Sequence, residues 1–260
     1  MLHGASGFVS PSVLSYDSTN WKAWRAAYLN AGFAVMDING YGISTSSNEA
    51  STHWGNPRAL ETIDKAFEEL KLKYNVCDKL MLHGSSMGGS TAWSYAFTHP
   101  NKVACLGLFA PAAISWIMLI DRNAANNYLW SAKAFGYATV QDAINDNYQR
   151  IVGYDPILRI MKFKNGLQRQ DNNLAGFDVL NYATEENLTI VGQSLPFPVR
   201  IWQGTNDEYN LLTLNQIIAG AYRNGGNIIT LRLCQGALHN MCVGANQYVV
   251  NESINYFKNA

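Results

Sequence analysis

The segment GSSMG at positions 84–88 constrains the fold of this chain more than any other part of the sequence. It follows residues 79–83, whose apolar side chains predict a buried strand, and it precedes a run of small residues that predicts a helix. A strand, a G-x-S-x-G turn and a helix together form a nucleophile elbow, in which a serine hydroxyl stands clear of the backbone. The glycines are needed because the tight turn leaves no room for other side chains. Ser86 is therefore the candidate nucleophile, and we expect its neighbour Ser85 to point into the turn.

A serine hydroxyl is a weak nucleophile near neutral pH, so the elbow requires a base and an acid to orient that base. In the chain order that accompanies this elbow, the acid follows the serine and a histidine follows the acid. Asp207 lies just after a predicted strand at 198–203, and His239 lies in the loop after a predicted strand at 228–233. Both side chains would lie beyond the carboxyl ends of strands, where parallel α/β sheets place their chemistry.

Other residues compete for these two roles. Three histidines precede Ser86 and have the wrong order, and His99 directly precedes a proline at a predicted helix end, where we expect it to cap the last turn. Glu208 competes with Asp207 for the role of the acid. Several aspartates lie in a stretch that looks inserted and are less favoured, namely Asp121, Asp142, Asp146, Asp155, Asp171 and Asp178. The favoured set is Ser86, Asp207 and His239.

Strand and helix patterns alternate along most of the chain. The predicted helices cover residues 20–31, 57–73, 87–98, 211–224 and 244–258. The predicted strands cover residues 33–37, 79–83, 103–109, 198–203 and 228–233. This alternation predicts an α/β fold with a doubly wound, mostly parallel sheet.

Residues 112–196 depart from this alternation, with scattered aromatic residues, many asparagines and no strand pattern. A segment of that length is too long for a bare loop in a compact domain. We therefore expect residues 1–111 and 197–260 to form the core, and residues 112–196 to form a helical cap over the edge of the sheet that carries Ser86. An aromatic side chain such as Trp116 would then line the substrate pocket.

The G-x-S-x-G turn, the acid, the histidine and two further segments resemble motifs of the α/β-hydrolase family. They occur in the family's order, at similar spacing, and over most of the chain. Residues 3–5 (His-Gly-Ala) resemble the oxyanion loop of the family, and residues 37–44 resemble its D-x-x-G-x-G-x-S stretch. Residues 204–207 resemble its acid turn, and residues 236–239 resemble its histidine loop.

The resemblance implies a serine hydrolase that acts on carboxylic esters without a metal ion or an organic cofactor. It also implies that the backbone N–H groups of Ala5 and Met87 hold the oxyanion, each typically contributing about 3 kcal/mol to the transition state. The same residues could serve a peptidase, an amidase, an acyltransferase or a carbohydrate O-acetyl esterase module of a larger protein. A binding module that has lost its activity is the alternative from another class.

Composition narrows the choice of partners. The 260 residues include 48% hydrophobic and 15% charged residues, which is typical of one globular α/β domain. The 19 basic and 19 acidic residues cancel, so there is no electrostatic reason to expect nucleic acid or an anionic membrane as a partner. No apolar stretch reaches the roughly 18 residues that a membrane span requires. The expected partner is a small-molecule ester, and the oligomeric state is left open.

Four cysteines show no metal-ligand spacing. Cys234 and Cys242 flank the histidine loop, and the sequence leaves open whether they form a disulfide. The start of the chain carries no pattern of a signal peptide, which favours the cytoplasm by default. The family resembled here builds two or three strands before its oxyanion loop, whereas this loop begins at residue 3. This favours a fragment of a longer protein, since an unprotected strand edge exposes pairing groups. If that longer protein is secreted, the default location does not hold.

Overall fold

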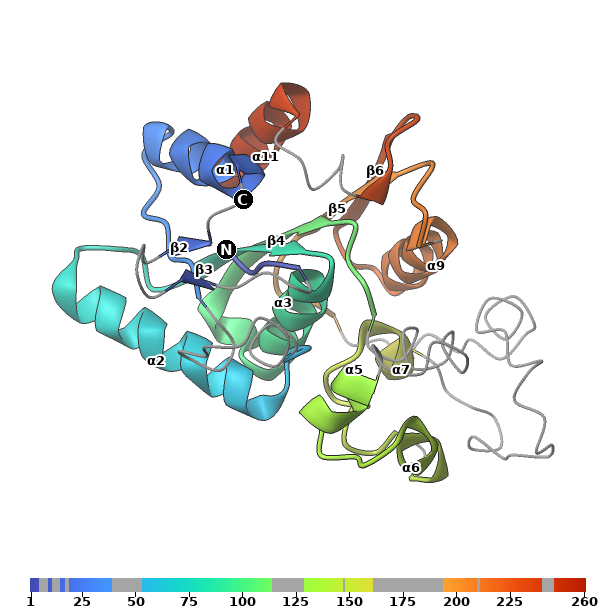
Figure 1. Ribbon diagram of the computed structural model, residues 1–260. Helices are drawn as coiled ribbons and strands as arrows, with labels where there is room; N and C mark the ends of the chain where they lie inside the picture. Colours follow the sequence, from blue (N-terminus) through green and yellow to red (C-terminus); the bar gives the residue numbers. More distant parts are fainter. Residues whose placement is uncertain are drawn as a thin grey trace.

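The computed structural model describes residues 1–4, 9–10, 15–16, 19–38, 53–113, 129–146, 148–160, 194–209, 211–239 and 246–260. Within them, a four-stranded parallel sheet has the order β3-β4-β5-β6 and carries helices on both faces (Figure 1). The strands are β3 (Leu80–Ser85), β4 (Val103–Phe109), β5 (Val199–Gly204) and β6 (Ile229–Cys234). A separate antiparallel pair is formed by β1 (Val9–Ser10) and β2 (Ser15–Tyr16). The predicted α/β fold with a parallel sheet is confirmed.

The helices pack in two layers. One face of the sheet is covered by α1 (Thr19–Asn30) and α11 (Gln247–Asn259), which contact each other. The other face is covered by α2 (Pro57–Lys73), α3 (Met87–Thr98) and α9 (Leu211–Asn224). A short 3₁₀ helix, η1 (Pro100–Lys102), leads from α3 into β4. None of the helices in the described ranges is both long and apolar enough to span a lipid bilayer.

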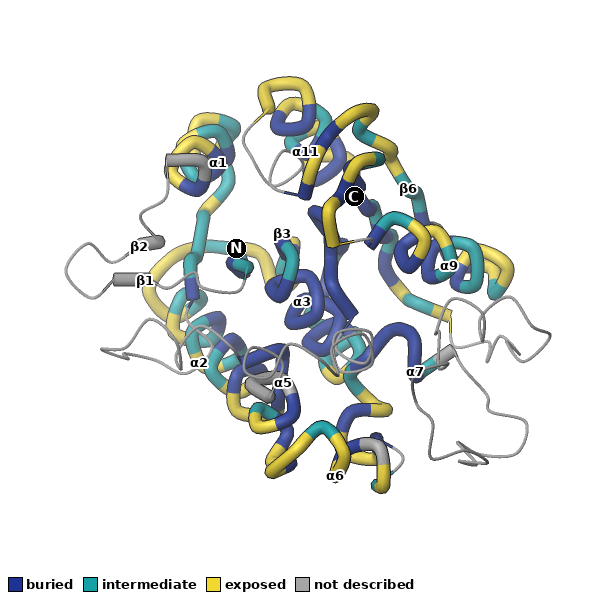
Figure 2. The backbone as a smooth tube through the Cα atoms, turned by 45° about the vertical axis from the view of Figure 1, so that its right-hand side comes forward, coloured by how far each residue is buried: buried dark blue, intermediate teal, exposed yellow. Residues whose placement is uncertain are grey.

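Alternation along β4 explains why there are two hydrophobic cores. Successive side chains of a strand point to opposite faces of the sheet. Leu106 and Leu108 therefore join the core beneath α2, α3 and α9, whereas Cys105 and Phe109 join the core beneath α1 and α11. Every residue of β4 except Ala104 is buried, which is expected of a central parallel strand covered on both faces. Figure 2 shows that α3 is also buried along most of its length.

Local signals set the bounds of α2 as predicted. The Asn56 side chain caps the helix by accepting a hydrogen bond from the Ala59 N–H at 2.9 Å. Pro57 suits the first turn because its missing N–H would have no partner there. The buried residues Ile63 and Phe67 lie one turn apart on the inward face. A capping asparagine, a proline and an apolar stripe were all visible in the sequence.

One predicted strand differs in the structure. Residues 33–38 lie beside the start of the chain but are not assigned as a strand. The Met1 amino group donates a hydrogen bond to the Met36 carbonyl at 2.5 Å, which joins this segment to the start of the chain. Leu2 in turn forms a single parallel bridge with Gly84 of β3. A strand is assigned only where a ladder of backbone bonds joins it to a neighbour, so the prediction of a strand at residues 33–37 was wrong.

The described part of residues 112–196 contains three short helices, α5 (Leu129–Ala134), α6 (Val140–Asn145) and α7 (Pro156–Ile160). Helix α7 contacts α3 and α9, and α5 contacts α6. Asn56 donates to the Ala134 carbonyl at 2.7 Å, and Ser94 of α3 donates to the Tyr154 carbonyl at 3.2 Å. Much of the expected cap, including Trp116, lies outside the described residues, as does Cys242. The division into core and cap therefore stays a prediction.

Candidate active site

Ser86 lies at the turn between the last residue of β3 and the first residue of α3. Its backbone has φ 51° and ψ −117°, a conformation that non-glycine residues rarely adopt. Ser86 is partly exposed, whereas the Ser85 side chain is completely buried. The strained backbone thus presents one hydroxyl, that of Ser86, at the carboxyl edge of the sheet.

Two glycines make this turn possible. A Cβ atom on Gly84 would lie 2.5 Å from the Gly88 carbonyl oxygen, and one on Gly88 would lie 2.0 Å from the Leu2 carbonyl oxygen. Both distances are far shorter than a van der Waals contact, and both clashes are with backbone. The glycines of the G-x-S-x-G segment are therefore required for steric reasons.

Asp207 and His239 are brought together by the loops after β5 and β6. His239 Nδ1 lies 2.9 Å from Asp207 Oδ2, and both side chains are buried. The two loops are also joined through their backbones, because the Asn206 N–H donates to the Ala237 carbonyl at 3.0 Å. These bonds fix the histidine ring relative to the acid without any contribution from a ligand.

Three donors converge on the Asp207 carboxylate. Oδ2 accepts from His239 and, at 2.8 Å, from Gln203 Nε2, and Oδ1 accepts from the Tyr209 N–H at 2.9 Å. Burial alone would raise the pKa of Asp207, but the hydrogen bond from His239, together with those from Gln203 and Tyr209, holds this pKa below its usual value. The ionised carboxylate accepts the Nδ1 proton of His239 and so leaves Nε2 as the basic nitrogen.

Glu208, the competing acid, makes a different contact. Its Oε2 accepts a hydrogen bond from the backbone N–H of His239 at 2.9 Å, and the carboxylate–ring hydrogen bond of His239 goes to Asp207. Tyr209 lies edge-on to the His239 ring at 4.8 Å between centroids, and it is 54% exposed. The sequence reasoning missed the roles of Tyr209 and Gln203. The visible signal for the second was a glutamine at the carboxyl end of the predicted strand that precedes Asp207.

The predicted oxyanion donors are only partly described. Met87 is the first residue of α3, where N–H groups lack partners within the helix and lie at the positive end of its dipole. Gly4 lies beside the elbow, since a Cβ atom built on it would be 3.2 Å from Ser86 Cβ and 3.8 Å from Ser86 Oγ. Ala5, the other predicted donor, lies outside the described residues.

The three predicted catalytic side chains follow different strands of one parallel sheet. Ser86 follows β3, Asp207 follows β5 and His239 follows β6, so all three lie at the carboxyl edge of the sheet. Backbone bonds hold the strand ends in place, including one from the Ser86 N–H to the Phe109 carbonyl at 3.0 Å. The arrangement suits attack by a serine hydroxyl assisted by a histidine. In the part of the chain that is described, no cluster of metal-ligating side chains is found.

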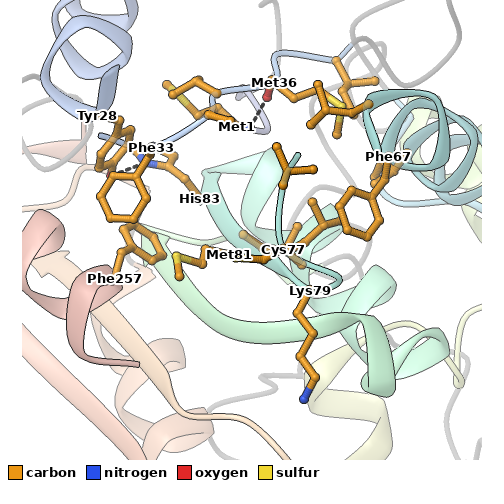
Figure 3. A pocket seen from close by; sticks show the side chains of 18 of the residues that line it. Met1, Tyr28, Phe33, Met36, Phe67, Cys77, Lys79, Met81, His83 and Phe257 are labelled. Atoms are coloured by element: carbon orange, nitrogen blue, oxygen red, sulfur yellow. Dashed lines mark hydrogen bonds between the residues drawn. The ribbon is translucent and has the colours of Figure 1, made fainter. Parts of the chain in front are cut away.

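An apolar cavity of about 350 Å³ lies elsewhere in the molecule. It lies beside the first half of β3, and Met1 is part of its wall. Phe33 and Phe257 enclose it from one side and Phe67 from the other (Figure 3). Its walls include none of the three predicted catalytic residues. The cavity is therefore distinct from the edge of the sheet that carries Ser86.

Comparison with known proteins gives a family match and structural matches. A family model described as serine aminopeptidase, S33, matches residues 23–243. The fold is similar to that of Est1E from Butyrivibrio proteoclasticus with bound ferulic acid, at a TM-score of 0.55 and 16% identity, over 99% of this chain and 86% of that one. The esterase Pf2001 of Pyrococcus furiosus gives a TM-score of 0.54 at 13% identity, over 94% and 79% of the two chains.

A structure from a study of two prolyl endopeptidases gives a TM-score of 0.57 at 14% identity, over 98% of this chain but only 32% of that one. At such identities the structural matches show the fold alone. No curated protein matches this chain by sequence.

Proposed function

Because the chain belongs to the serine aminopeptidase (S33) family of α/β-hydrolases, we propose that it is a serine hydrolase that cleaves carboxylic esters through an acyl-enzyme on Ser86. The observation that carries this proposal is the pairing of His239 Nδ1 with Asp207 Oδ2 at 2.9 Å, on the sheet edge where Ser86 occupies its strained turn. A serine elbow and an oriented histidine are the two parts that acyl transfer requires.

The chemistry follows from these positions. Ser86 Oγ attacks the ester carbonyl carbon while His239 Nε2 takes its proton, and the carbonyl oxygen becomes an oxyanion. The N–H groups of Met87 and of Ala5 stabilise that charge. The bond to the alcohol oxygen then breaks, and His239 returns the proton to the leaving alcohol. Water attacks the acyl-enzyme in the same way, releases the acid and restores Ser86. Asp207 stabilises the imidazolium in both halves of the reaction.

Chromogenic esters of increasing acyl length, together with fluorophosphonate labelling, test the proposal. We expect Ser86→Ala to abolish labelling and to lower kcat by on the order of 10⁶-fold, with the fold unchanged. Ser85→Ala is the matched control. Its hydroxyl is buried and has no hydrogen-bond partner within the described residues, so we expect its removal to have little effect. Equal losses in both variants would contradict the assignment of Ser86, and an unlabelled, inactive wild type would indicate a non-catalytic module.

A peptidase is the second candidate, because the matching family model is described as an aminopeptidase and one similar structure comes from prolyl endopeptidases. The same residues would then protonate an amine instead of an alcohol. Aminoacyl p-nitroanilides, measured beside p-nitrophenyl esters of the same acyl groups, separate the two candidates. If the protein is an esterase, the ratio of kcat/KM for the ester to kcat/KM for the anilide should exceed the ratio of their uncatalysed hydrolysis rates.

A further inference from the structure

A chain of buried amide groups leads from the end of β4 to the acid of the predicted triad. Asn215 of α9 donates from Nδ2 to the Pro111 carbonyl at 3.1 Å and to Gln203 Oε1 at 2.7 Å. Gln203 of β5 in turn donates from Nε2 to Asp207 Oδ2 at 2.8 Å. Asp207 accepts the ring N–H of His239 on the same oxygen. Side chains from α9, β5 and the loop after β6 are thus linked through hydrogen bonds to the Asp207 carboxylate.

The acceptors at the two ends of this series of hydrogen bonds determine how both side-chain amides are oriented. The Pro111 carbonyl and the ionised Asp207 carboxylate can only accept hydrogen bonds. If the Gln203 amide were turned round, its oxygen would face the Asp207 carboxylate and its NH₂ would face the NH₂ of Asn215. If the Asn215 amide were turned round, its oxygen would face the Pro111 carbonyl. Only one orientation of the two amides satisfies both ends, and in it an N–H always points at Asp207.

The burial of the two amides argues against a role in packing alone. Both side chains are completely excluded from solvent. Asn215 Oδ1 is buried and has no hydrogen-bond partner among the described residues. An unsatisfied buried acceptor is costly, whereas two apolar side chains of similar shape would avoid that cost. The arrangement satisfies the Pro111 and Gln203 oxygens and, through a bond from Gln203 Nε2 at 3.2 Å, the Gly204 carbonyl. It leaves the asparagine's own oxygen unpaired, and it supplies a donor to Asp207.

We propose that Gln203 and Asn215 are positioning residues for catalysis, which hold the Asp207 carboxylate in the one rotamer that meets His239. This rests on the proposed function. Gln203 acts on Asp207 directly, and Asn215 acts by keeping the Gln203 amide from turning round. Without them, Asp207 keeps its Tyr209 N–H bond on Oδ1 but loses a fixed direction for Oδ2, and the His239 ring loses its orientation with it.

The first test is the pH dependence of Gln203→Met, a change of nearly equal shape that removes both amide groups. We expect kcat to fall roughly tenfold to a hundredfold with KM unchanged, because a misplaced general base slows the chemical step and leaves binding intact. The acid-side limb of the kcat/KM profile should also move, because the carboxylate that pairs with His239 loses one of its three donors and its fixed direction.

The second test uses the order of the chain. Asn215→Leu should lower kcat by a smaller factor than Gln203→Met, because the glutamine can still donate in part of its orientations. The double variant should be no slower than Gln203→Met alone, because Asn215 acts only through Gln203. Losses that multiply in the double variant would overturn the proposal.

Asn227→Leu is the matched control. Asn227 is also a buried amide with two hydrogen bonds, donating to the Tyr222 carbonyl and accepting from the Leu195 N–H, but it has no bond to Asp207. We expect this variant to lower the melting temperature without moving the acid-side limb. A shift of that limb as large as in Gln203→Met would show that the effect is only loss of stability, and would overturn the proposal.

The proton between His239 Nδ1 and Asp207 gives a readout that needs no turnover. It should appear as a far-downfield ¹H NMR resonance in the wild type, vanish in Asp207→Ala, and shift or broaden in Gln203→Met and Asn215→Leu. An unchanged resonance in both folded variants would overturn the positioning role. If the resonance responds as expected but no ester is cleaved, the proposed function fails and the positioning role stands. If Gln203→Met does not fold, the result for Asn215→Leu decides.

Discussion

At the scale of single residues, two adjacent acids in one turn have separate contacts. Asp207 accepts from the ring of His239, and Glu208 accepts from its backbone N–H. From the sequence alone, either residue could be the acid that pairs with His239, since both lie just beyond a strand. Neighbouring side chains in a turn point in different directions, so the distinction requires the fold.

The first prediction concerns these two acids. We expect Asp207→Asn to lower kcat by on the order of 10⁴-fold, because an asparagine side chain can stabilise the wrong tautomer of the histidine and carries no charge to balance imidazolium. Glu208→Gln keeps an oxygen that can accept from the backbone of His239, so we expect less than about a tenfold loss. The measurement is kcat on one chromogenic ester. A larger loss in the Glu208 variant would reverse the assignment of the two acids.

Sequence reasoning found Asp207 and His239 as a candidate pair because chain order and strand ends are local features. It could not find the bond between Gln203 and Asn215, because the two residues lie on different elements and meet only when α9 packs on β5. Ser85 and Ser86 could be separated in advance, since the turn geometry alone determines which hydroxyl is presented. Contacts that form only through tertiary packing cannot be predicted from a single sequence.

At the scale of elements, the best-predicted segments carry their own signals. Helices α2, α3 and α9 and strand β4 have the predicted bounds. Helices α2 and α9 each carry an apolar stripe, and α3 is bounded by the G-x-S-x-G turn before it and by Pro100 after it. The segment at 33–38 shows the limit of such signals, because a strand exists only when a neighbour pairs with it along its length.

The cap of α2 gives the second prediction. Asn56 accepts from the Ala59 N–H and donates to the Ala134 carbonyl, so it holds both α2 and the end of α5. We expect Asn56→Ala to lower the free energy of unfolding by about 1–2 kcal/mol. Asn56→Asp keeps the capping oxygen and loses only the donor, so its loss should be smaller. Urea denaturation measures both.

Asn246→Ala is the matched control for this prediction. Asn246 caps α11 in the same way, by accepting from the Tyr248 N–H at 3.0 Å, but it is exposed. Its loss should be limited to the capping contribution, roughly 0.5–1 kcal/mol. Equal losses for Asn56→Ala and Asn246→Ala would show that the bond to Ala134 contributes nothing to stability.

At the scale of the whole molecule, buried histidines connect stability to pH. Burial, with a smaller contribution from the charge of His3, lowers the pKa of His53 to about 3. Burial, with a smaller contribution from the Met1 ammonium group, lowers the pKa of His83 well below its usual value. His83 Nδ1 also lies 2.9 Å from the Tyr28 hydroxyl. Both rings are therefore neutral in the folded protein at pH values where the unfolded chain protonates them.

The last prediction follows from this difference. Histidine in an unfolded chain has a pKa of about 6.5, so below that pH these two rings carry two more protons in the unfolded state than in the folded state. The two rings should therefore make the free energy of unfolding fall as pH decreases, by about 1.4 kcal/mol per pH unit each, or about 2.8 kcal/mol per pH unit together. The window from about pH 6 to pH 5 lies above the range in which protonation of Asp207, whose pKa is lowered, reduces stability. Urea denaturation at several pH values measures the slope.

His53→Asn can keep the acceptor facing the Gly55 N–H and removes one titrating ring. It should therefore lower the slope by about 1.4 kcal/mol per pH unit. A wild-type slope near zero in this window would mean that both rings are protonated in the folded protein, and a slope unchanged by His53→Asn would mean that His53 is not one of the two groups.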